Sequence, residues 1–213
     1  MPEISVLVPV YNRARFIERC IRSLLNQETE VAFEIICIND GSQDDTREII
    51  SKFETKIRII DIAINSGLPT ALNSGLKESL GRFIVRVDSD DFVSSRFIDL
   101  LNYTLVSNPK FHAVACDYIT FNDEGDENII SCEESPIACG ILFRKESLLS
   151  VGGYNENFKM HEDKELRLRF DKRYDVVRLP IPLYRYHLHS EGMTNNSQKS
   201  SYYLELLSEM RKM

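Results

Sequence analysis

Long apolar runs, a basic excess and paired cysteines are all missing from this chain of 213 residues. No apolar stretch approaches the ~18 residues that a membrane-spanning helix needs, which argues against a segment that spans a membrane. The formal net charge of −7 argues against a nucleic-acid-binding protein, because contacts with phosphates require a basic surface. The first ten residues, MPEISVLVPV, lack the basic start of a signal peptide. We therefore expect a soluble, cytoplasmic protein.

The five cysteines are odd in number and show no CxxC spacing. Two of them, Cys20 and Cys37, lie inside apolar segments of regular periodicity. We therefore expect buried free thiols, which fit a reducing compartment.

A chain of 213 residues can form one domain that buries roughly 70% of its unfolded surface. Over residues 1–110, apolar runs typical of strands alternate with segments of helical periodicity. This alternation predicts a parallel sheet with helices on both faces, and therefore an α/β fold. The expected strands are 4–10, 33–38, 57–62 and 83–87, and the expected helices are 13–26 (capped by Asn12), 44–53, 68–79 and 96–106.

Beyond residue 110 the alternation is less regular, and no internal repeat or low-complexity linker interrupts the chain. A single domain over residues 1–213, with a more irregular second half, is therefore expected. Its elements are strands at 113–121 and 183–187, a polar excursion at 123–134, and helices at 163–171 and 202–213. One face of the last helix fits core packing or a partner contact equally well. That face consists of Tyr203, Leu206, Leu207 and Met210.

Short polar segments follow each of the first four expected strands, at 9–12, 39–42, 65–67 and 88–91. Because the carboxyl ends of parallel strands meet at one edge of a sheet, these segments are expected to share a ligand-binding edge. Each segment alone also fits ordinary turn or helix-start chemistry. Four such segments on the same edge favour a binding site.

Three carboxylates, those of Asp88, Asp90 and Asp91, crowd the end of the strand expected at 83–87. Two carboxylates ~4 Å apart repel each other by roughly 4 kcal/mol at an effective dielectric constant near 20. A divalent cation removes this cost, and such cations hold phosphate-bearing substrates through one or two carboxylates. The alternative is an acidic loop that caps the next helix.

Seven short motifs follow one another between residue 4 and about residue 194. They are PVYN at 9–12, NDGSQDDT at 39–46, NSGLPTALNSGL at 65–76, RVDSDD at 86–91, GGYNE at 152–156, HED at 161–163 and YRYHLHSEGMT at 184–194. In this order they resemble the inverting family-2 glycosyltransferases, which have the GT-A fold. Any one motif is weak evidence, whereas seven in the family's order are highly specific.

The resemblance implies a Rossmann-like, mostly parallel sheet flanked by helices. Residues 1–110 would form the nucleotide-sugar-binding half, 111–195 the acceptor and catalytic half, and 196–213 a C-terminal helix. Tyr11 would place its ring against the base or ribose, and Asp40 would accept a base N–H, which suits uracil. The full nucleotide-binding set implied by the resemblance is Pro9, Val10, Tyr11, Asn12, Asp40, Asn65, Gly67, Asn73, Asp88 and Ser89.

The resemblance also implies a metal site. Asp90 would bind a Mg²⁺ or Mn²⁺ ion that bridges the two phosphates, with Asp88 near the ribose or a metal-bound water. His189 matches the family's late histidine and would complete the metal shell or donate to a phosphate oxygen, and a structural hydrogen bond is the alternative. His187 stands where many relatives carry a basic residue, which leaves open which histidine serves the site.

Asp163 matches the aspartate of the family's ED motif, which implies a base that takes the proton of the acceptor hydroxyl. Glu162 is the second candidate and is assigned to acceptor positioning. On the local sequence alone, both residues also fit the acidic first turn of a helix. Leu72 departs from the family, which frequently has arginine there, so Arg13 or Arg86 is the candidate for a replacement phosphate contact.

We therefore expect a metal-dependent, inverting glycosyltransferase that moves a sugar from a nucleotide-sugar donor, most simply a UDP-sugar, to an acceptor hydroxyl. The acceptor would be a carbohydrate or a lipid-linked molecule in polysaccharide or glycolipid synthesis, which allows peripheral attachment to the inner face of a membrane. One alternative is a catalytically silent nucleotide-sugar-binding protein, which would normally show a broken DxD or ED motif. The other is a nucleotidyltransferase, which would need a glycine-rich basic loop that PVYNRARF does not provide.

Overall fold

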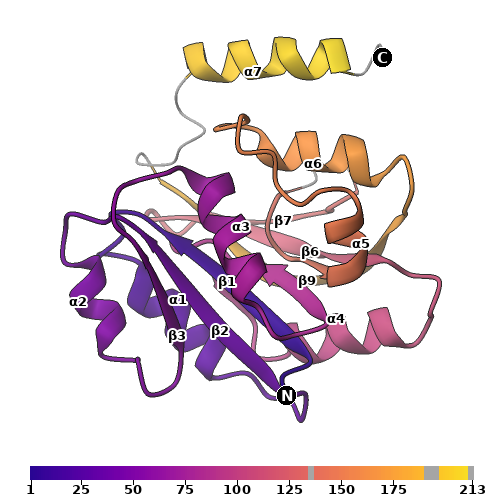
Figure 1. Cartoon of the computed structure of the whole chain (residues 1–213). Helices are drawn as coiled ribbons and strands as arrows, with labels where there is room; N and C mark the ends of the chain where they lie inside the picture. Colours follow the sequence, from indigo (N-terminus) through magenta and orange to yellow (C-terminus); the bar gives the residue numbers. More distant parts are fainter. Residues whose placement is uncertain (134–136, 190–196, 211–213) are drawn as a thin grey trace.

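The computed structural model describes residues 1–133, 137–189 and 197–210 and is built around one mixed β-sheet (Figure 1). Nine strands form the sheet in these ranges, in the order β3-β2-β1-β4-β8-β6-β9-β5, with β7 paired to β6. The strands are β1 (Ile4–Val10), β2 (Phe33–Asp40), β3 (Arg58–Ile62), β4 (Phe83–Arg86), β5 (Phe92–Val93), β6 (Ala113–Asn122), β7 (Glu127–Ile130), β8 (Ile141–Arg144) and β9 (Val176–Leu188). The helices are α1 (Ile17–Leu25), α2 (Thr46–Ser51), α3 (Leu68–Glu78), α4 (Phe97–Val106), α5 (Lys145–Ser150), α6 (Glu162–Phe170) and α7 (Ser197–Met210).

The first half of the chain forms the parallel part of the sheet. Strands β3, β2, β1 and β4 are parallel to one another, as the alternating pattern predicts. Helices α1, α2 and α4 contribute buried residues to one face, and α3, α5 and α6 contribute to the other. The predicted α/β architecture is therefore confirmed, and the carboxyl ends of the parallel strands bring the polar segments together at one edge.

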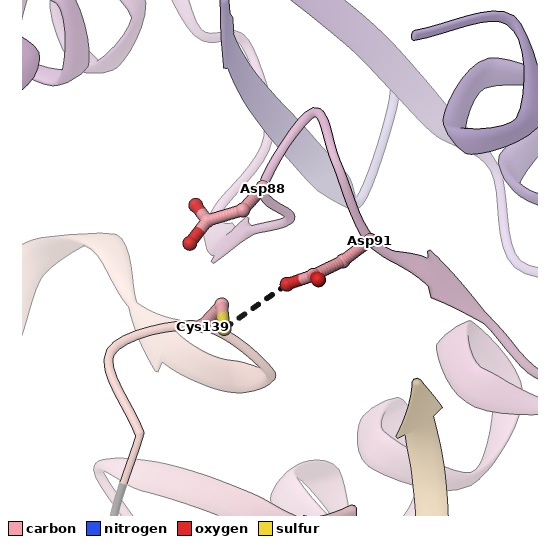
Figure 2. Close-up of side chains that lie close together, drawn as sticks. All are labelled: Asp88, Asp91 and Cys139. Carbon is pink, nitrogen blue, oxygen red and sulfur yellow. Dashed lines mark hydrogen bonds between the residues drawn. The ribbon is translucent and has the colours of Figure 1, made fainter. Parts of the chain in front are cut away.

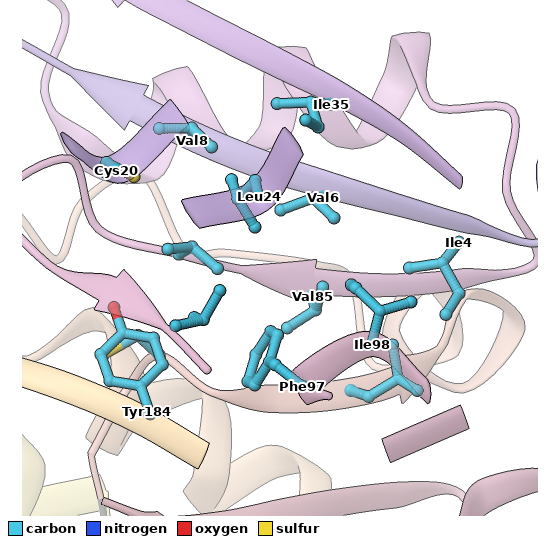
Figure 3. Packing of buried hydrophobic residues seen from close by; sticks show 14 of the residues in the cluster. Ile4, Val6, Val8, Cys20, Leu24, Ile35, Val85, Phe97, Ile98 and Tyr184 are labelled. Carbon is cyan, nitrogen blue, oxygen red and sulfur yellow. The ribbon is translucent and has the colours of Figure 1, made fainter. Parts of the chain in front are cut away.

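Strand β1 contributes side chains to the hydrophobic cores on both faces of the sheet and is buried along its whole length. Val6 belongs to the core that includes Val85 and Phe97 (Figure 3), whereas Leu7 packs in the core on the opposite face. The one polar residue inside the strand, Ser5, donates its hydroxyl hydrogen to Glu34 at 2.6 Å and accepts the Gly81 N–H at 2.8 Å. Burial on both faces explains why this strand reads as a near-continuous apolar run.

The second half of the chain is more irregular, as expected. Strand β8 is antiparallel to both β4 and β6, and β6 pairs in parallel with β9 through an irregular register near Asp117. The predicted polar excursion at 123–134 is wrong in part, because strand β7 forms a hairpin with β6 there. Most side chains of β7 are exposed, so the segment carries no apolar alternation that would reveal a strand. Strands β5 and β8 and helix α5 are short and were not predicted.

Helix α1 begins at Ile17 rather than at residue 13, and the predicted N-cap role of Asn12 is wrong. Asn12 has a left-handed backbone (φ 50°), and its side-chain oxygen accepts the Gln43 N–H at 2.8 Å. The backbone N–H groups of Arg13 and Ala14 donate instead to the side chains of Thr46 and Asp44, at 2.8 and 3.1 Å. Side chains of the β2–α2 connection and of the first residue of α2 thus hold residues 12–14 outside the helix.

All five cysteines are buried free thiols, as predicted. Helix α7 packs through the expected apolar face: the Tyr203 ring lies 5.6 Å from that of Phe158, and Leu207 is buried. The last residues of the helix predicted at 202–213 lie outside the described ranges. Within those ranges, no helix is both long enough and apolar enough to cross a membrane.

Replacing Phe97 by alanine should lower the free energy of unfolding by about 3–5 kcal/mol, because Phe97 is fully buried and alanine leaves a cavity. Tyr103 lies on the same helix with 70% of its surface exposed, so Tyr103→Ala should change stability by only about 0.5 kcal/mol or less. Urea unfolding of the two variants measures both values. Equal losses would show that α4 does not pack through Phe97.

Candidate active site

A cavity of about 680 Å³ opens at the carboxyl ends of the parallel strands. Its walls come from the ends of β1, β2 and β4, the start of α3, the start of α6 and the end of β9. The residues that the sequence singled out and that line this cavity are Pro9, Val10, Tyr11, Asp40, Asn65, Gly67, Asp88, Ser89, Asp90, Glu162, Asp163 and His189. The volume is in the range of pockets that hold small ligands.

Asp40 shapes the wall of the cavity between β2 and α3. Its carboxylate accepts the Ser66 N–H and hydroxyl at 2.8 and 2.7 Å, and the Gly67 N–H at 2.8 Å. Gly67 precedes α3 with φ 94°, a left-handed conformation that favours glycine. The buried carboxylate therefore fixes the loop that leads into α3 and still lines the cavity.

Asn12 and Asn73 are not among the residues that line the cavity. Asn12 binds the β2–α2 connection, as described above. Asn73 donates to the Tyr154 carbonyl at 2.9 Å and accepts the Tyr154 N–H at 3.0 Å, and it also donates to Glu156. Asn73 thus ties α3 to the segment that follows α5.

Asp88 is held by Arg86, the last residue of strand β4. Arg86 donates to both Asp88 carboxylate oxygens, at 2.5 and 3.0 Å, and to Glu162 at 2.7 Å. Only 6% of the Arg86 and Glu162 side chains is exposed, against 22% for Asp88. Burial raises the pKa of Glu162, and the Arg86 charge offsets part of that rise.

Asp90 lies between a cation and a histidine. One of its carboxylate oxygens contacts Arg13 Nε at 3.2 Å and His189 Nε2 at 3.0 Å. The other ring nitrogen of His189, Nδ1, is buried and has no hydrogen-bond partner among the described residues. Such an atom is uncommon in native proteins and fits a bound ion or water nearby.

His187 has a different surrounding from His189, although both line the cavity. Its Nε2 lies 3.0 Å from Asp123 in the β6–β7 turn, and its backbone N–H donates to Asp91 at 2.8 Å. Burial lowers the pKa of His187. Asp123 also pairs with Arg15 at 3.1 Å, so the hairpin turn is tied to the segment before α1.

Asp91 points into the protein. It accepts the Tyr184 hydroxyl at 2.7 Å and the Cys139 thiol at 3.9 Å, and Figure 2 shows its carboxylate directed at the Cys139 sulfur. Burial, followed by the charges of Asp88 and Asp90, raises the pKa of Asp91 well above its usual range. The Tyr184 hydroxyl also accepts the Asp88 N–H at 3.0 Å, which fixes the turn that carries all three aspartates.

The acidic corner fits a divalent cation. Asp88, Asp91 and Cys139 each offer a ligand atom within 4.8 Å of the others, close enough to share one ion. Asp90 and His189 lie outside this group of three; they pair with each other at 3.0 Å and line the same cavity. Carboxylate oxygen suits Mg²⁺ and Mn²⁺, and imidazole nitrogen is a common ligand of transition metals.

Asp163 lies in the acidic first turn of α6 and lines the cavity. Its side chain is partly exposed, and the carboxylate makes no hydrogen bond or ion pair with the residues that the structure describes. His161, directly before the helix, has a left-handed backbone (φ 57°) and lies 2.8 Å from the Ser200 hydroxyl of α7. Asp163 is therefore a carboxylate that is available to a ligand.

Several lining residues were not predicted as site residues. Arg13, Arg86 and His187 were considered as alternatives, and their aspartate partners could not be read from the sequence. The others are Leu68, Ala71, Asp91, Ile137, Ala138, Cys139, Lys159, Met160, His161, Lys164 and Tyr186. Asp91 was visible in the carboxylate cluster, but the loop residues carry no signal outside their tertiary setting.

Comparison with known proteins shows which family the sequence matches. A sequence model described as Glycosyl transferase family 2 matches residues 5–148. The uncharacterized glycosyltransferase EpsJ of Bacillus subtilis (strain 168) is 41% identical over 121 residues, which cover 55% of this chain and 34% of EpsJ. The chain therefore spans about a third of the length of that relative.

Two solved structures are similar across most of the chain. TarS 1–349 of S. aureus in complex with UDP-GlcNAc has a TM-score of 0.77 at 21% identity and covers 92% of this chain and 61% of its own. Mannosyltransferase PcManGT from Pyrobaculum calidifontis, in complex with GDP-Man and Mn²⁺, has a TM-score of 0.76 at 18% identity and covers 95% and 62%. These similarities confirm the predicted GT-A fold. Because the family's sequence model matches more than half of the chain, from β1 into α5, this chain belongs to glycosyl transferase family 2.

Proposed function

We propose that this chain is a metal-dependent, inverting glycosyltransferase that transfers a sugar from a UDP-sugar to an acceptor hydroxyl. The observation that carries the proposal is that Asp88 and Asp90 line the same cavity as the available carboxylate of Asp163. Complexes of TarS with UDP-GlcNAc and of PcManGT with GDP-Man and Mn²⁺ support a nucleotide-sugar donor. The acceptor we propose is a carbohydrate or lipid-linked molecule of a cell-surface polysaccharide or glycolipid.

The donor nucleotide would lie against the ends of β1 and β2. Pro9 and Val10 offer backbone groups there, and Tyr11, with 38% of its surface exposed, offers a ring to the base or ribose. Three donors already occupy the Asp40 carboxylate. Since an ionised carboxylate has about four acceptor sites, one remains for the imide N–H of uracil.

Asp88, Asp90 and His189 are the residues that we assign to a Mn²⁺ or Mg²⁺ ion. When bound, the ion would offset the negative charge that develops on the leaving diphosphate. Arg13 contacts the same Asp90 oxygen as His189, so Arg13 lies within reach of a diphosphate at this corner.

Asp163 is the proposed base. Its carboxylate would take the proton of the acceptor hydroxyl while that oxygen attacks the anomeric carbon from the side opposite the leaving diphosphate, which inverts the configuration. Glu162 is less suited to this role, because it is buried and its Oε1 atom is engaged by Arg86. We assign Glu162 to positioning.

UDP should stabilise the protein only when Mn²⁺ is present. At a UDP concentration of ~100 times its Kd, binding contributes about 2.7 kcal/mol, which for a domain of this size raises Tm by ~5–10 °C. Thermal denaturation with UDP, GDP and nucleoside triphosphates, each with Mn²⁺ or with EDTA, measures the effect. Stabilisation by nucleoside triphosphates alone would favour a nucleotidyltransferase and contradict the proposal.

Replacing Asp163 by asparagine should reduce sugar transfer by ~10²-fold or more, because the amide cannot accept the proton. The UDP affinity in Mn²⁺ should stay within about 2-fold of wild type. Release of UDP from a panel of UDP-sugars in the presence of candidate acceptors measures turnover, and calorimetry measures affinity. Asp171→Asn, the same change at the far end of α6, is the matched control and should leave turnover unchanged. Full activity of Asp163→Asn would remove the residue from the base role.

A further inference from the structure

A single buried arginine joins two acidic motifs that lie 76 residues apart in the chain. Arg86 precedes the aspartate cluster at the end of β4, whereas Glu162 opens α6. The guanidinium donates through Nε and Nη2 to Asp88 and through Nη1 to Glu162, at 2.5, 3.0 and 2.7 Å. One side chain therefore bridges the proposed metal side of the cavity and the helix that carries Asp163.

The hydrogen bonds of Arg86 go to carboxylates and leave no guanidinium nitrogen without a carboxylate partner for a phosphate. Each of its three guanidinium nitrogens donates to a carboxylate, and only 6% of its side chain is exposed. The planar fork of arginine satisfies two acceptor groups at fixed angles, which the single ammonium of lysine cannot do. The phosphate contact that the sequence suggested for Arg86 is therefore unsupported by its surroundings.

The two ends of this bridge differ in how firmly the rest of the fold holds them. Strand β4 lies between β1 and β8, and the Arg86 carbonyl accepts the Gly140 N–H at 3.2 Å, so the arginine is anchored in the sheet. The start of α6 has no side-chain cap and follows His161 in a left-handed conformation. The Arg86–Glu162 hydrogen bond is thus a direct tie between the sheet and the first turn of α6.

We propose that Arg86 is a positioning residue that sets the first turn of α6, and with it Asp163, relative to Asp88. The inference rests on the proposed function for its kinetic part. Glu162 is the residue of α6 that Arg86 holds. Because Asp163 follows Glu162 in the helix, this hydrogen bond also fixes where Asp163 lies relative to the sheet. A shift of about 1 Å in a reacting group can cost ~10²-fold in rate, so the bridge has a kinetic consequence as well as a structural one.

A second arginine–glutamate pair on the same helix provides a matched control. Arg169 donates to both Glu165 oxygens, at 2.8 and 2.5 Å, and also binds the Gly153 carbonyl. Glu165 is buried like Glu162, but neither Arg169 nor Glu165 lines the cavity. Arg169→Lys therefore weakens the attachment of α6 without touching the Arg86 bridge.

The test compares Arg86→Lys, Glu162→Gln, the double variant and Arg169→Lys. We expect Arg86→Lys to lower kcat by ~10²-fold and Glu162→Gln by ~10-fold, with the KM for the donor of Glu162→Gln within about 3-fold of wild type. The double variant should lose no more than about 2-fold beyond Arg86→Lys, because residues that act in series are not additive. Arg169→Lys should keep kcat within about 3-fold of wild type, even if its Tm falls as far as that of Arg86→Lys.

Hydrogen–deuterium exchange gives a readout that needs no substrate. Amides 161–165 should exchange faster in Arg86→Lys than in wild type, whereas Arg169→Lys should affect the later turns of α6. Unchanged exchange at 161–165 would overturn the inference, whatever the activity. So would a double variant whose loss is the product of the single losses, or an Arg169→Lys variant that loses kcat as Arg86→Lys does. If Arg86→Lys does not fold, Glu162→Gln carries the same two readouts.

A wild-type protein that binds no UDP and turns over no donor would contradict the proposed function. The exchange experiment would still decide whether Arg86 sets the first turn of α6, so the two failures are distinguishable.

Discussion

The concentration of negative charge at the end of β4 is the constraint around which this structure is organised. Three aspartates within four residues would repel one another by several kcal/mol if nothing compensated them. Each is compensated differently: Asp88 by Arg86, Asp90 by Arg13 and His189, and Asp91 by hydrogen bonds from the Tyr184 hydroxyl and the His187 N–H. The partners come from β4, the segment before α1 and β9, so the compensation joins distant parts of the chain.

The same contacts decide which of the three carboxylates can reach a ligand. Asp91, turned inward, serves the protein, because its bonds to Tyr184 and the His187 N–H hold the turn in place. Asp88 and Asp90 remain at the cavity wall, where part of each carboxylate reaches solvent. The same cluster therefore divides into one structural carboxylate and two that can meet a ligand. A sequence pattern of three adjacent acids does not by itself reveal that division.

Local pattern was sufficient for the parallel half of the fold. Strands buried on both faces, such as β1, carry continuous apolar runs, and the polar segments that end them locate the site edge. Exposed or very short elements, such as β7 and β5, leave no such pattern. Asn12 is not a cap because side chains from the β2–α2 connection and the start of α2, 30 or more residues away, bind the backbone around it. For the same reason, the local sequence does not show that Arg13 contacts Asp90 or that Arg86 contacts Glu162, because these partners lie 77 and 76 residues apart.

The buried cysteines have a practical consequence. Burial raises the pKa of Cys37 and of Cys116 to about 12 and that of Cys132 to about 11. Since only the thiolate attacks alkylating reagents and disulfides, these sulfurs are almost inert at neutral pH while the fold is closed. Alkylation of the chain then reports opening of the structure, and each modified cysteine marks the part of the core that opened.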